Sequence, residues 1–385
     1  MNSIKLNAKS RSFINQFKDK FLKAEKKWKK KYSVEYSEFT NQEIQYIPNI
    51  EQYEPSILHS LHSFSKKKYS FHFSTLTRDI EVILISPIDK TNQEILSYMK
   101  LIFIWFNGID SYANPSCSKK LEIYLSLSPS LKLIPNEKFI PFGKKDANTA
   151  FTYTCREKNV IHIFRQEEWF KVLMHETFHN LDLDFSKYDH GFSDKYIRTI
   201  FPNMKNTKFY ESYCEVWALI FHSLFYSLHS KKSFNRILND ELEFSMFQCA
   251  KILNHFNMKY SDFYSNIQTA ILSRSRYSEN TPILSYYFFK TIFLYHINDF
   301  LEWCSIENSN SIRFSKLPIH YVNIYQKIEN LVIFLEEHYK SSSFLTAMKN
   351  EEKNFQKNKK TIKLNDIFHF KTMRMTIHDL HNAST

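Results

Sequence analysis

Glycine is scarce in this chain, because among 385 residues only Gly108, Gly143 and Gly191 occur. Phosphate-binding loops and dinucleotide-binding fingerprints need several closely spaced glycines, so the sequence excludes both and predicts no nucleotide cofactor. The shortage also argues against an all-β architecture, because the tight turns that join many short strands depend on glycine. At this length the chain can bury a large core, and we expect two lobes.

Apolar stretches that direct secretion or membrane insertion are also missing from the sequence. The N-terminus is polar and has no apolar core of about 7–15 residues, which a secretory signal would have. The longest apolar stretch, Ile283 to Trp303, predicts a buried helix because it is interrupted by Lys290, His296, Asn298 and Asp299. Five scattered cysteines without paired spacing (117, 155, 214, 249 and 304) predict free thiols in a reducing compartment. We therefore expect an intracellular protein.

Positive charge is abundant, with a formal net charge of +12 and a pI of about 9.2. Eight lysines lie between Lys18 and Lys31. Aromatic and small apolar residues recur around them at helical spacing, namely Phe13, Phe17, Phe21, Ala24 and Trp28. This pattern predicts a basic amphipathic helix. We expect its aromatic side to pack on the protein itself; the alternative is contact with an anionic membrane or nucleic acid.

The segment His175-Glu176-Thr177-Phe178-His179 carries the clearest chemical signal in the sequence. It lies within residues 167–181, which we expect to form a helix. Residues four apart on a helix lie about 5–6 Å from each other, so the two imidazoles can bind one metal ion. Glu176 would then lie beside the metal, where it can take a proton from a bound water molecule.

The surroundings of this motif favour a functional metal helix over a chance match. Residues 160–164 are typical of a strand, and Glu167 and Glu168 are expected in the first helical turn, where carboxylates suit the helix dipole. An apolar stripe recurs at spacings of three and four, through Phe170, Met174, Phe178 and Leu181. Both histidines lie off this stripe, so one side of the helix can pack while another binds metal. The alternative is a partly exposed helix that carries two unrelated histidines.

A catalytic zinc usually has three protein ligands and one water molecule, so a third ligand is required. In one arrangement a glycine follows the second histidine by three residues and a His or Asp follows it by six. Those positions hold Asp182 and Phe185, so this arrangement fails. Three further polar residues lie nearby at spacings that match no established pattern: Asp184, Asp189 and His190.

A second helix, around residues 211–220, is expected to supply the missing ligand. Glu211 and Glu215 share one face of it by their spacing of four, and the rest of the helix is strongly apolar. Because buried carboxylates need cations or donors, Glu211 is the candidate third ligand, and Glu215 can accept a hydrogen bond from a ligand histidine. Cys214 is expected to pack in the core, away from Glu211. The alternative is a first helical turn with two solvated glutamates.

The His-Glu-x-x-His motif and the downstream Glu-x-x-x-acid pair together resemble the gluzincin branch of zinc metallopeptidases, the thermolysin-like group. The resemblance implies a Zn²⁺ cofactor and a peptide or protein substrate. It implies His175, His179 and Glu211 as zinc ligands and Glu176 as the general base. The function expected on this ground is that of a zinc metallopeptidase, a hydrolase.

Other positions match the family less closely. Glu215 corresponds to the acid that orients a ligand histidine, where the family usually has Asp, and Tyr210 stands where it often has Asn. The segment from 148 to 153, with Asn148 and Ala150, looks like the edge strand with which zincins hold an extended peptide. The Phe, Tyr, Lys, Asn and Ile bias is similar to that of proteins of large DNA viruses. That similarity implies host cytoplasm or the virion as the location.

We expect an α+β, zincin-like fold, in which a small mixed β-sheet lobe carries the active-site helix and a mainly helical lobe follows. A helix is expected at 95–106. Strands are expected at 69–73, 79–86, 121–127, 151–154 and 160–164.

Four parts of the chain are distinguished by composition and pattern. They are a basic helical segment at 1–60, the zincin-like lobe at 61–194, the helical lobe at 195–345, and a polar linker with a C-terminal tail at 346–385. Within the last part, residues 348–363 are expected to be solvated and residues 367–380 to pack as a short element.

Hydrolysis by this scheme needs one more donor, to stabilise the oxyanion of the tetrahedral intermediate. The preferred candidates are Tyr286 and Tyr287, which follow a turn at 280–282. The other candidates are Tyr210, Tyr213 and His222.

Two other classes of function stay open at this stage. The first is a non-catalytic protein in which zinc ties two lobes together. The second is a basic binding module for nucleic acid or an anionic membrane, in which the metal motif is accidental. The oligomeric state is left open by the sequence.

Overall fold

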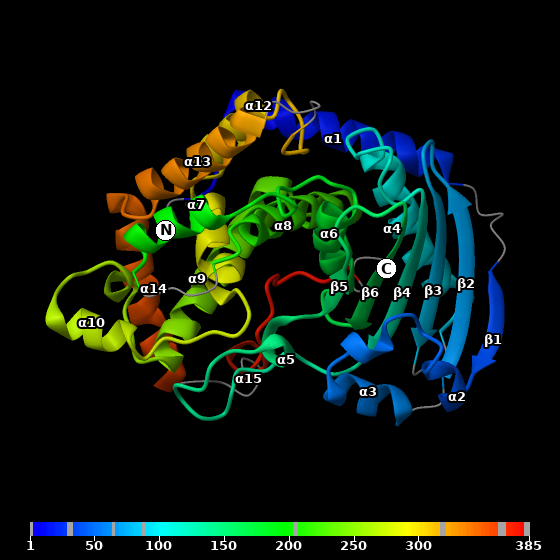
Figure 1. The fold of residues 1–385 in the computed structure, drawn as a ribbon, viewed down its shortest axis with the longest axis horizontal. Coiled ribbons are helices and arrows are strands. Elements are labelled where there is room, and N and C mark those ends of the chain that lie inside the picture. The colour runs from blue at the N-terminus through cyan, green and yellow to red at the C-terminus, as the bar shows by residue number, and fades with distance from the viewer. Residues whose placement is uncertain are drawn as a thin grey trace.

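A six-stranded mixed sheet lies at one side of the molecule and a group of helices at the other (Figure 1). The computed structural model describes residues 3–28, 34–63, 66–86, 90–202, 207–315, 321–360 and 367–380. The α+β class expected from the sequence is confirmed. Within the described residues, no helix has both the length and the apolar character needed to cross a membrane.

The sheet has the strand order β1-β2-β3-β4-β6-β5. Strands β3, β4 and β6 pair in parallel at its centre, while β1, β2 and β5 pair antiparallel, so β5 is an edge strand. The bounds are β1 (Glu35–Phe39), β2 (Lys66–Ser74), β3 (Asp79–Ser86), β4 (Lys120–Ser128), β5 (Ala150–Thr152) and β6 (Lys158–Arg165). All five strands expected from the sequence are confirmed, and β1 is an addition.

Both faces of the sheet are covered, which explains the nearly continuous apolar run of β3. Ile80 and Val82 face the main core, and Ile83 and Ile85 face a smaller core on the opposite side. The smaller core is closed by three short helices, α2 (Asn41–Ile44), η1 (Ile50–Gln52) and α3 (Pro55–His62).

The remaining helices are mostly in the second half of the chain, as expected for residues 195–345. In chain order they are α1 (Ala8–Lys27), α4 (Asn92–Ile109), α5 (Lys144–Ala147), α6 (Trp169–Asn180), α7 (Gly191–Ile200), α8 (Tyr210–His229), α9 (Phe234–His255), η2 (Tyr260–Phe263), α10 (Gln268–Arg274), the π-helical turn η3 (Leu284–Phe289), α11 (Lys290–Tyr295), α12 (Ile297–Glu307), α13 (Tyr321–His338), α14 (Ser342–Lys360) and α15 (Ile367–Lys371).

Helix α1 packs its aromatic side on α4, α8 and α12, as the preferred interpretation predicted. Phe21 stacks on Trp105 of α4, and Phe17 meets Trp217 of α8 edge-on. A Cβ at Gly108 of α4 would clash with the ring of Phe21, so the missing side chain permits this close approach. The N-terminal segment therefore shares one core with the sheet and the helices.

The expectation of a linker at 348–363 is wrong for residues 348–360, which belong to α14, although most of these residues are exposed as expected. Despite its many lysines, α14 packs on α9, and it buries Phe344, Met348 and Phe355. These apolar residues recur along one helix face, so burial of that face outweighs the polar composition. Residues 361–363 lie outside the described part of the chain.

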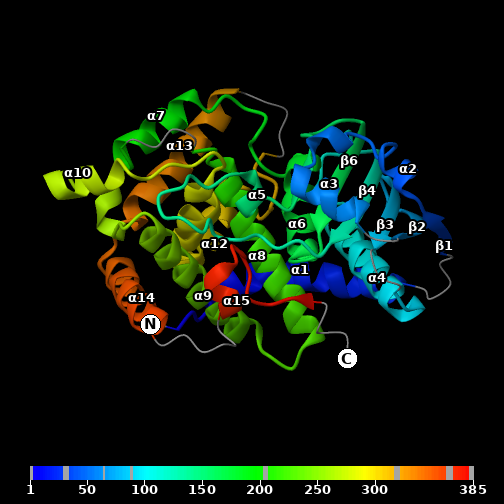
Figure 2. The same cartoon turned by 90° about the horizontal axis from the view of Figure 1, so that it is seen from below.

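The C-terminal segment 371–378 packs as a short buried element, as expected for 367–380, and crosses α8 and α9 (Figure 2). The backbone N–H groups of Met375 and Thr376 each donate to Glu168, at 2.6 Å, and Ile377 N–H donates to Glu241 at 3.1 Å. Both carboxylates are buried, and these bonds satisfy them in place of water. The segment is thereby fixed directly behind α6.

The expected role of Glu167 and Glu168 in the first turn of the metal helix is wrong. Both residues precede α6, and Glu168 has a left-handed backbone with φ of 59°. Glu168 forms a buried ion pair with Lys132, and its second oxygen holds the C-terminal segment. Glu168 therefore interacts with residues far away in the sequence, and not with the dipole of α6. The sequence alone gives no sign of these partners.

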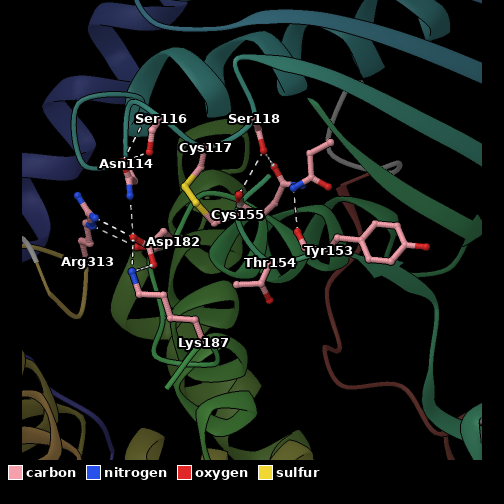
Figure 3. Close-up of a disulfide and its surroundings, with 12 residues drawn as sticks. Asn114, Ser116, Cys117, Ser118, Tyr153, Thr154, Cys155, Asp182, Lys187 and Arg313 are labelled. Carbon is pink, nitrogen blue, oxygen red and sulfur yellow. Dashed lines mark hydrogen bonds and ion pairs between the residues drawn. A yellow bond between two sulfur atoms is a disulfide. The ribbon is translucent and has the colours of Figure 1, made fainter. Parts of the chain in front are cut away.

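Cys117 and Cys155 form a disulfide, so the expectation of five free thiols is wrong for these two (Figure 3). They are 38 residues apart and are brought together by the sheet, because Cys117 precedes β4 and Cys155 lies between β5 and β6. The other three cysteines are buried free thiols, as expected: Cys214, Cys249 and Cys304. The cysteines therefore no longer argue for a reducing compartment.

Asp182 lies near the disulfide and joins three segments at the end of α6 (Figure 3). It accepts hydrogen bonds from Asn114 at 2.9 Å and Arg313 at 2.8 Å, and pairs with Lys187 at 2.7 Å. Its backbone is left-handed, with φ of 59°, so the chain reverses direction immediately after α6.

His162 of β6 is a buried polar group with a measurable consequence for stability. Its ring stacks between Tyr124 and Phe151, and Nδ1 lies 3.0 Å from the hydroxyl of Tyr53. Burial lowers the pKa of His162 from 6.5 to about 3. The unfolded chain therefore binds a proton at a higher pH than the folded chain does.

We predict that His162→Phe makes the protein less sensitive to acid. Because the folded pKa is depressed, His162 destabilises the fold as the pH falls from 6.5 towards about 3, by about 1.4 kcal/mol per pH unit. The slope of unfolding free energy against pH can be measured by urea denaturation between those limits. In the variant this slope should correspond to about one proton fewer taken up on unfolding. His59→Phe, at an exposed histidine, should keep the wild-type slope; equal slopes for wild type and His162→Phe would contradict the prediction.

Candidate metal centre

Helix α6 carries His175, Glu176 and His179 between the sheet and α8. It packs on β5 and β6 on one side and along α8 on the other. The expected apolar stripe is buried, and all of α6 except His179 is buried as well. The face that carries the histidines therefore lies against α8 and a cleft, and Glu211 and Glu215 at the start of α8 face it.

Three ligand atoms converge as the sequence predicted. Nε2 of His175 lies 3.1 Å from Oε2 of Glu211, Nε2 of His179 lies 3.2 Å from the same oxygen, and the two nitrogens are 3.2 Å apart. A tetrahedral ion with bonds of about 2.0–2.1 Å has ligand atoms about 3.3–3.4 Å apart. The triangle therefore fits one small divalent cation after a shift of a few tenths of an ångström.

The outer nitrogen of each ring faces a carboxylate, which points both inner nitrogens at the same place. Nδ1 of His175 lies 2.8 Å from Glu215, which is ion-pair distance, but the alignment of the expected hydrogen bond is not reached. Glu215 is also paired with the buried Lys171. Nδ1 of His179 lies 2.5 Å from Asp184, which the sequence left unassigned. Asp184 reaches this position because the chain reverses at Asp182.

The histidines and carboxylates of the cluster shift one another's pKa values. Burial lowers the pKa of His175, but Glu215 and Glu211 outweigh it and raise that pKa to about 9. Burial raises the pKa of Glu211, yet His179 and His175 hold it well below its usual range. The rings therefore favour their protonated forms near neutral pH, and a metal ion would have to displace these protons in order to bind.

Cys214 is buried in the core, as expected, but it also contacts the cluster. Its Sγ lies 3.4 Å from Asp184 and 3.8 Å from Nδ1 of His179. Burial raises the pKa of this thiol well above its usual value, so it stays protonated and donates to Asp184. It supports the outer side of the His179 ring.

A cleft of about 310 Å³ opens onto His175, Glu176, His179 and Glu211. Asn148 and Ala150 line it, as predicted for the edge strand, and β5 forms one wall. A second wall comes from residues 280–282 and from Tyr286. The hydroxyl of Thr281 donates to the side chain of Asn148 at 2.9 Å and ties the two walls together.

Of the candidate oxyanion donors, two line the cleft. The ring of Tyr286 lies 6.1 Å from that of His175, and the ring of Tyr210 lies 5.7 Å from that of His179. Burial, together with Glu211 and Glu176, raises the pKa of Tyr286 well above its usual value, so its hydroxyl remains a donor.

The other three candidates are corrected, because none of them lines the cleft. The hydroxyl of Tyr287 donates to the carbonyl of Met373 at 2.6 Å, and that of Tyr213 donates to the carbonyl of Ile312 at 2.8 Å. His222 is buried within α8, and burial lowers its pKa to about 3. Each of these side chains packs in the core.

We predict that Asp184→Asn weakens zinc binding about 10–100-fold, the usual effect of losing a carboxylate that orients a ligand histidine. The substitution preserves shape and removes the charge. Apparent affinity can be measured at pH 7 by competition with a chromophoric chelator. Asp189→Asn is the matched control, since Asp189 lies in the same loop, is exposed and, among the described residues, accepts a hydrogen bond only from the N–H of Gly191. Equal affinities for the two variants would contradict the assignment.

No family model and no curated protein matches this sequence, and no solved structure matches the fold. The functional conclusion therefore depends on the geometry of the cluster and its cleft.

Proposed function

We propose that this protein is a zinc-dependent peptidase with a zincin-like arrangement, in which a sheet lobe and a helical lobe meet at the metal. One observation carries the proposal: His175, His179 and Glu211 converge beside Glu176 at the base of a cleft edged by β5. A strand edge, a base and a three-ligand site in one cleft are the parts that peptide hydrolysis requires.

Zinc suits the donor set better than the common alternatives. Two imidazoles and one carboxylate are typical of catalytic zinc, whereas magnesium and calcium prefer oxygen ligands alone. Three protein ligands leave a coordination position free, which distinguishes this set from a closed structural site. When bound, zinc would supply a Lewis acid that polarises a carbonyl and lowers the pKa of water.

Glu176 supplies the proton transfers in this scheme. Its side chain lines the cleft and is nearly buried, and burial raises the pKa of its carboxyl above the usual value. A raised pKa moves a carboxylate towards the operating pH, at which it can take a proton from the attacking water and return it to the leaving amine.

The cleft walls account for substrate placement. As an edge strand, β5 has one side unpaired within the sheet and can add an extended peptide by backbone hydrogen bonds. Tyr286, on the second wall, keeps its proton and can donate to the developing oxyanion. The peptide carbonyl would thus lie between the β5 edge and Tyr286.

We predict that Glu176→Gln retains zinc and loses cleavage of a fluorogenic peptide library by about 10²–10⁴-fold, the usual contribution of a general base. Metal content is measured alongside activity on the zinc-loaded protein. Glu157→Gln, at an exposed glutamate in the β5–β6 turn, is the control and should cleave as wild type does. If Glu176→Gln cleaves as fast as wild type, the base assignment fails.

Tyr286 and Tyr287 allow an oxyanion-stabilising tyrosine to be compared with a neighbouring tyrosine that only packs in the core. Tyr286→Phe should lower kcat about 10²–10³-fold with little change in KM, as loss of one oxyanion donor does. Tyr287→Phe should leave kcat unchanged and cost about 1 kcal/mol of stability, because only its bond to Met373 is lost. Steady-state kinetics and urea unfolding of both variants test this, and the reverse pattern would refute it.

A further inference from the structure

The cleft has an uneven distribution of charge outside the proposed catalytic cluster. Glu176 and Glu211 are the carboxylates among the described residues that line it, and both belong to that cluster. The remaining charged residues on the lining are Lys144 and Lys208, and most of the others are neutral and polar: Asn148, Thr152, Thr154, Ser186, Tyr210, Asn280, Thr281 and Tyr286. A substrate in the cleft therefore meets two positive charges and no spare negative one.

These two lysines differ from the lysines behind the cleft. Lys132 and Lys171 are buried and neutralised by Glu168 and Glu215. Lys144 and Lys208 are exposed, and neither has an ion-pair partner within the described part of the chain. Their charges are thus available to a ligand.

The backbone holds both lysines next to the site. Lys144 opens α5, and its carbonyl accepts a bond of 2.8 Å from the N–H of Asn148, just before the β5 wall. Lys208 precedes α8 and has a left-handed backbone with φ of 34°. Its carbonyl accepts a bond of 2.9 Å from the N–H of Glu211, so Lys208 is held three residues from a ligand position.

We propose that Lys144 and Lys208 form a subsite for a carboxylate of the substrate, so that the preferred substrates are acidic peptides. This inference rests on the proposed peptidase function. The carboxylate has two sources with the same chemistry, an Asp or Glu side chain near the scissile bond, or the free carboxyl at the end of the peptide chain. A lysine side chain can bind a carboxylate from either source, because it acts as a point charge.

The experiment compares kcat/KM of the zinc-loaded protein on matched quenched peptides. One pair differs by Glu against Gln beside the scissile bond, with the C-terminus amidated. A second pair is neutral in sequence and differs by a free or amidated C-terminus. We expect about a tenfold preference for the acidic member of one pair, since two partly exposed ion pairs contribute that much. The pair that shows it identifies the source of the carboxylate.

Charge substitutions then test the two lysines. In Lys144→Gln/Lys208→Gln the ratio should fall to about one, and in Lys144→Glu/Lys208→Glu it should invert; added salt should reduce the wild-type ratio. Lys145→Gln/Lys195→Gln, at two exposed lysines that do not line the cleft, is the control and should keep the ratio.

The outcomes separate this inference from the function on which it rests. Cleavage of all four peptides at equal rates overturns the subsite and leaves the peptidase proposal standing. If no peptide is cleaved, the peptidase proposal fails, and binding of the same peptides is measured by fluorescence anisotropy. The subsite is then supported if wild type binds an acidic peptide more tightly than its neutral partner and Lys144→Gln/Lys208→Gln does not. Equal binding of the acidic and neutral peptides by wild type overturns it.

Discussion

The contact between α6 and α8 is the interaction on which the rest of the site depends. Each helix carries ionisable groups that would be costly to bury alone, because a charge without a partner loses its hydration. Glu211 and Glu215 of α8 are acceptable in the core because His175, His179 and Lys171 of α6 face them. The register that pairs these charges is therefore the same one that brings His175, His179 and Glu211 together.

The central part of this arrangement was predictable because it depends on local geometry. A spacing of four residues fixes neighbours on a helix, so the positions of His175 with His179 and of Glu211 with Glu215 followed from the sequence. The buried strands were equally clear from their β-branched runs. That the two helices face each other was a hypothesis drawn from the need of buried carboxylates for partners, and the geometry agrees with it.

What the sequence did not indicate depends on contacts between distant segments. Asp184 reaches His179 only because the chain reverses at Asp182, and Cys117 meets Cys155 only because the sheet aligns their loops. Tyr286 and Tyr287 are neighbours with the same chemistry, and only the packing of η3 decides which faces the cleft. Lys171 resembles a solvated charge in the sequence, and only the fold shows that it is buried against Glu215.

The segment 371–378 also makes the start of α6 depend on a distant part of the chain. Its backbone N–H groups donate to Glu168, which precedes α6, and to Glu241 of α9. Without these donors, two buried carboxylates would lose hydrogen bonds that water could not replace. Loss of this segment would therefore weaken the support of the helix that carries His175 and His179, although none of its residues lines the cleft.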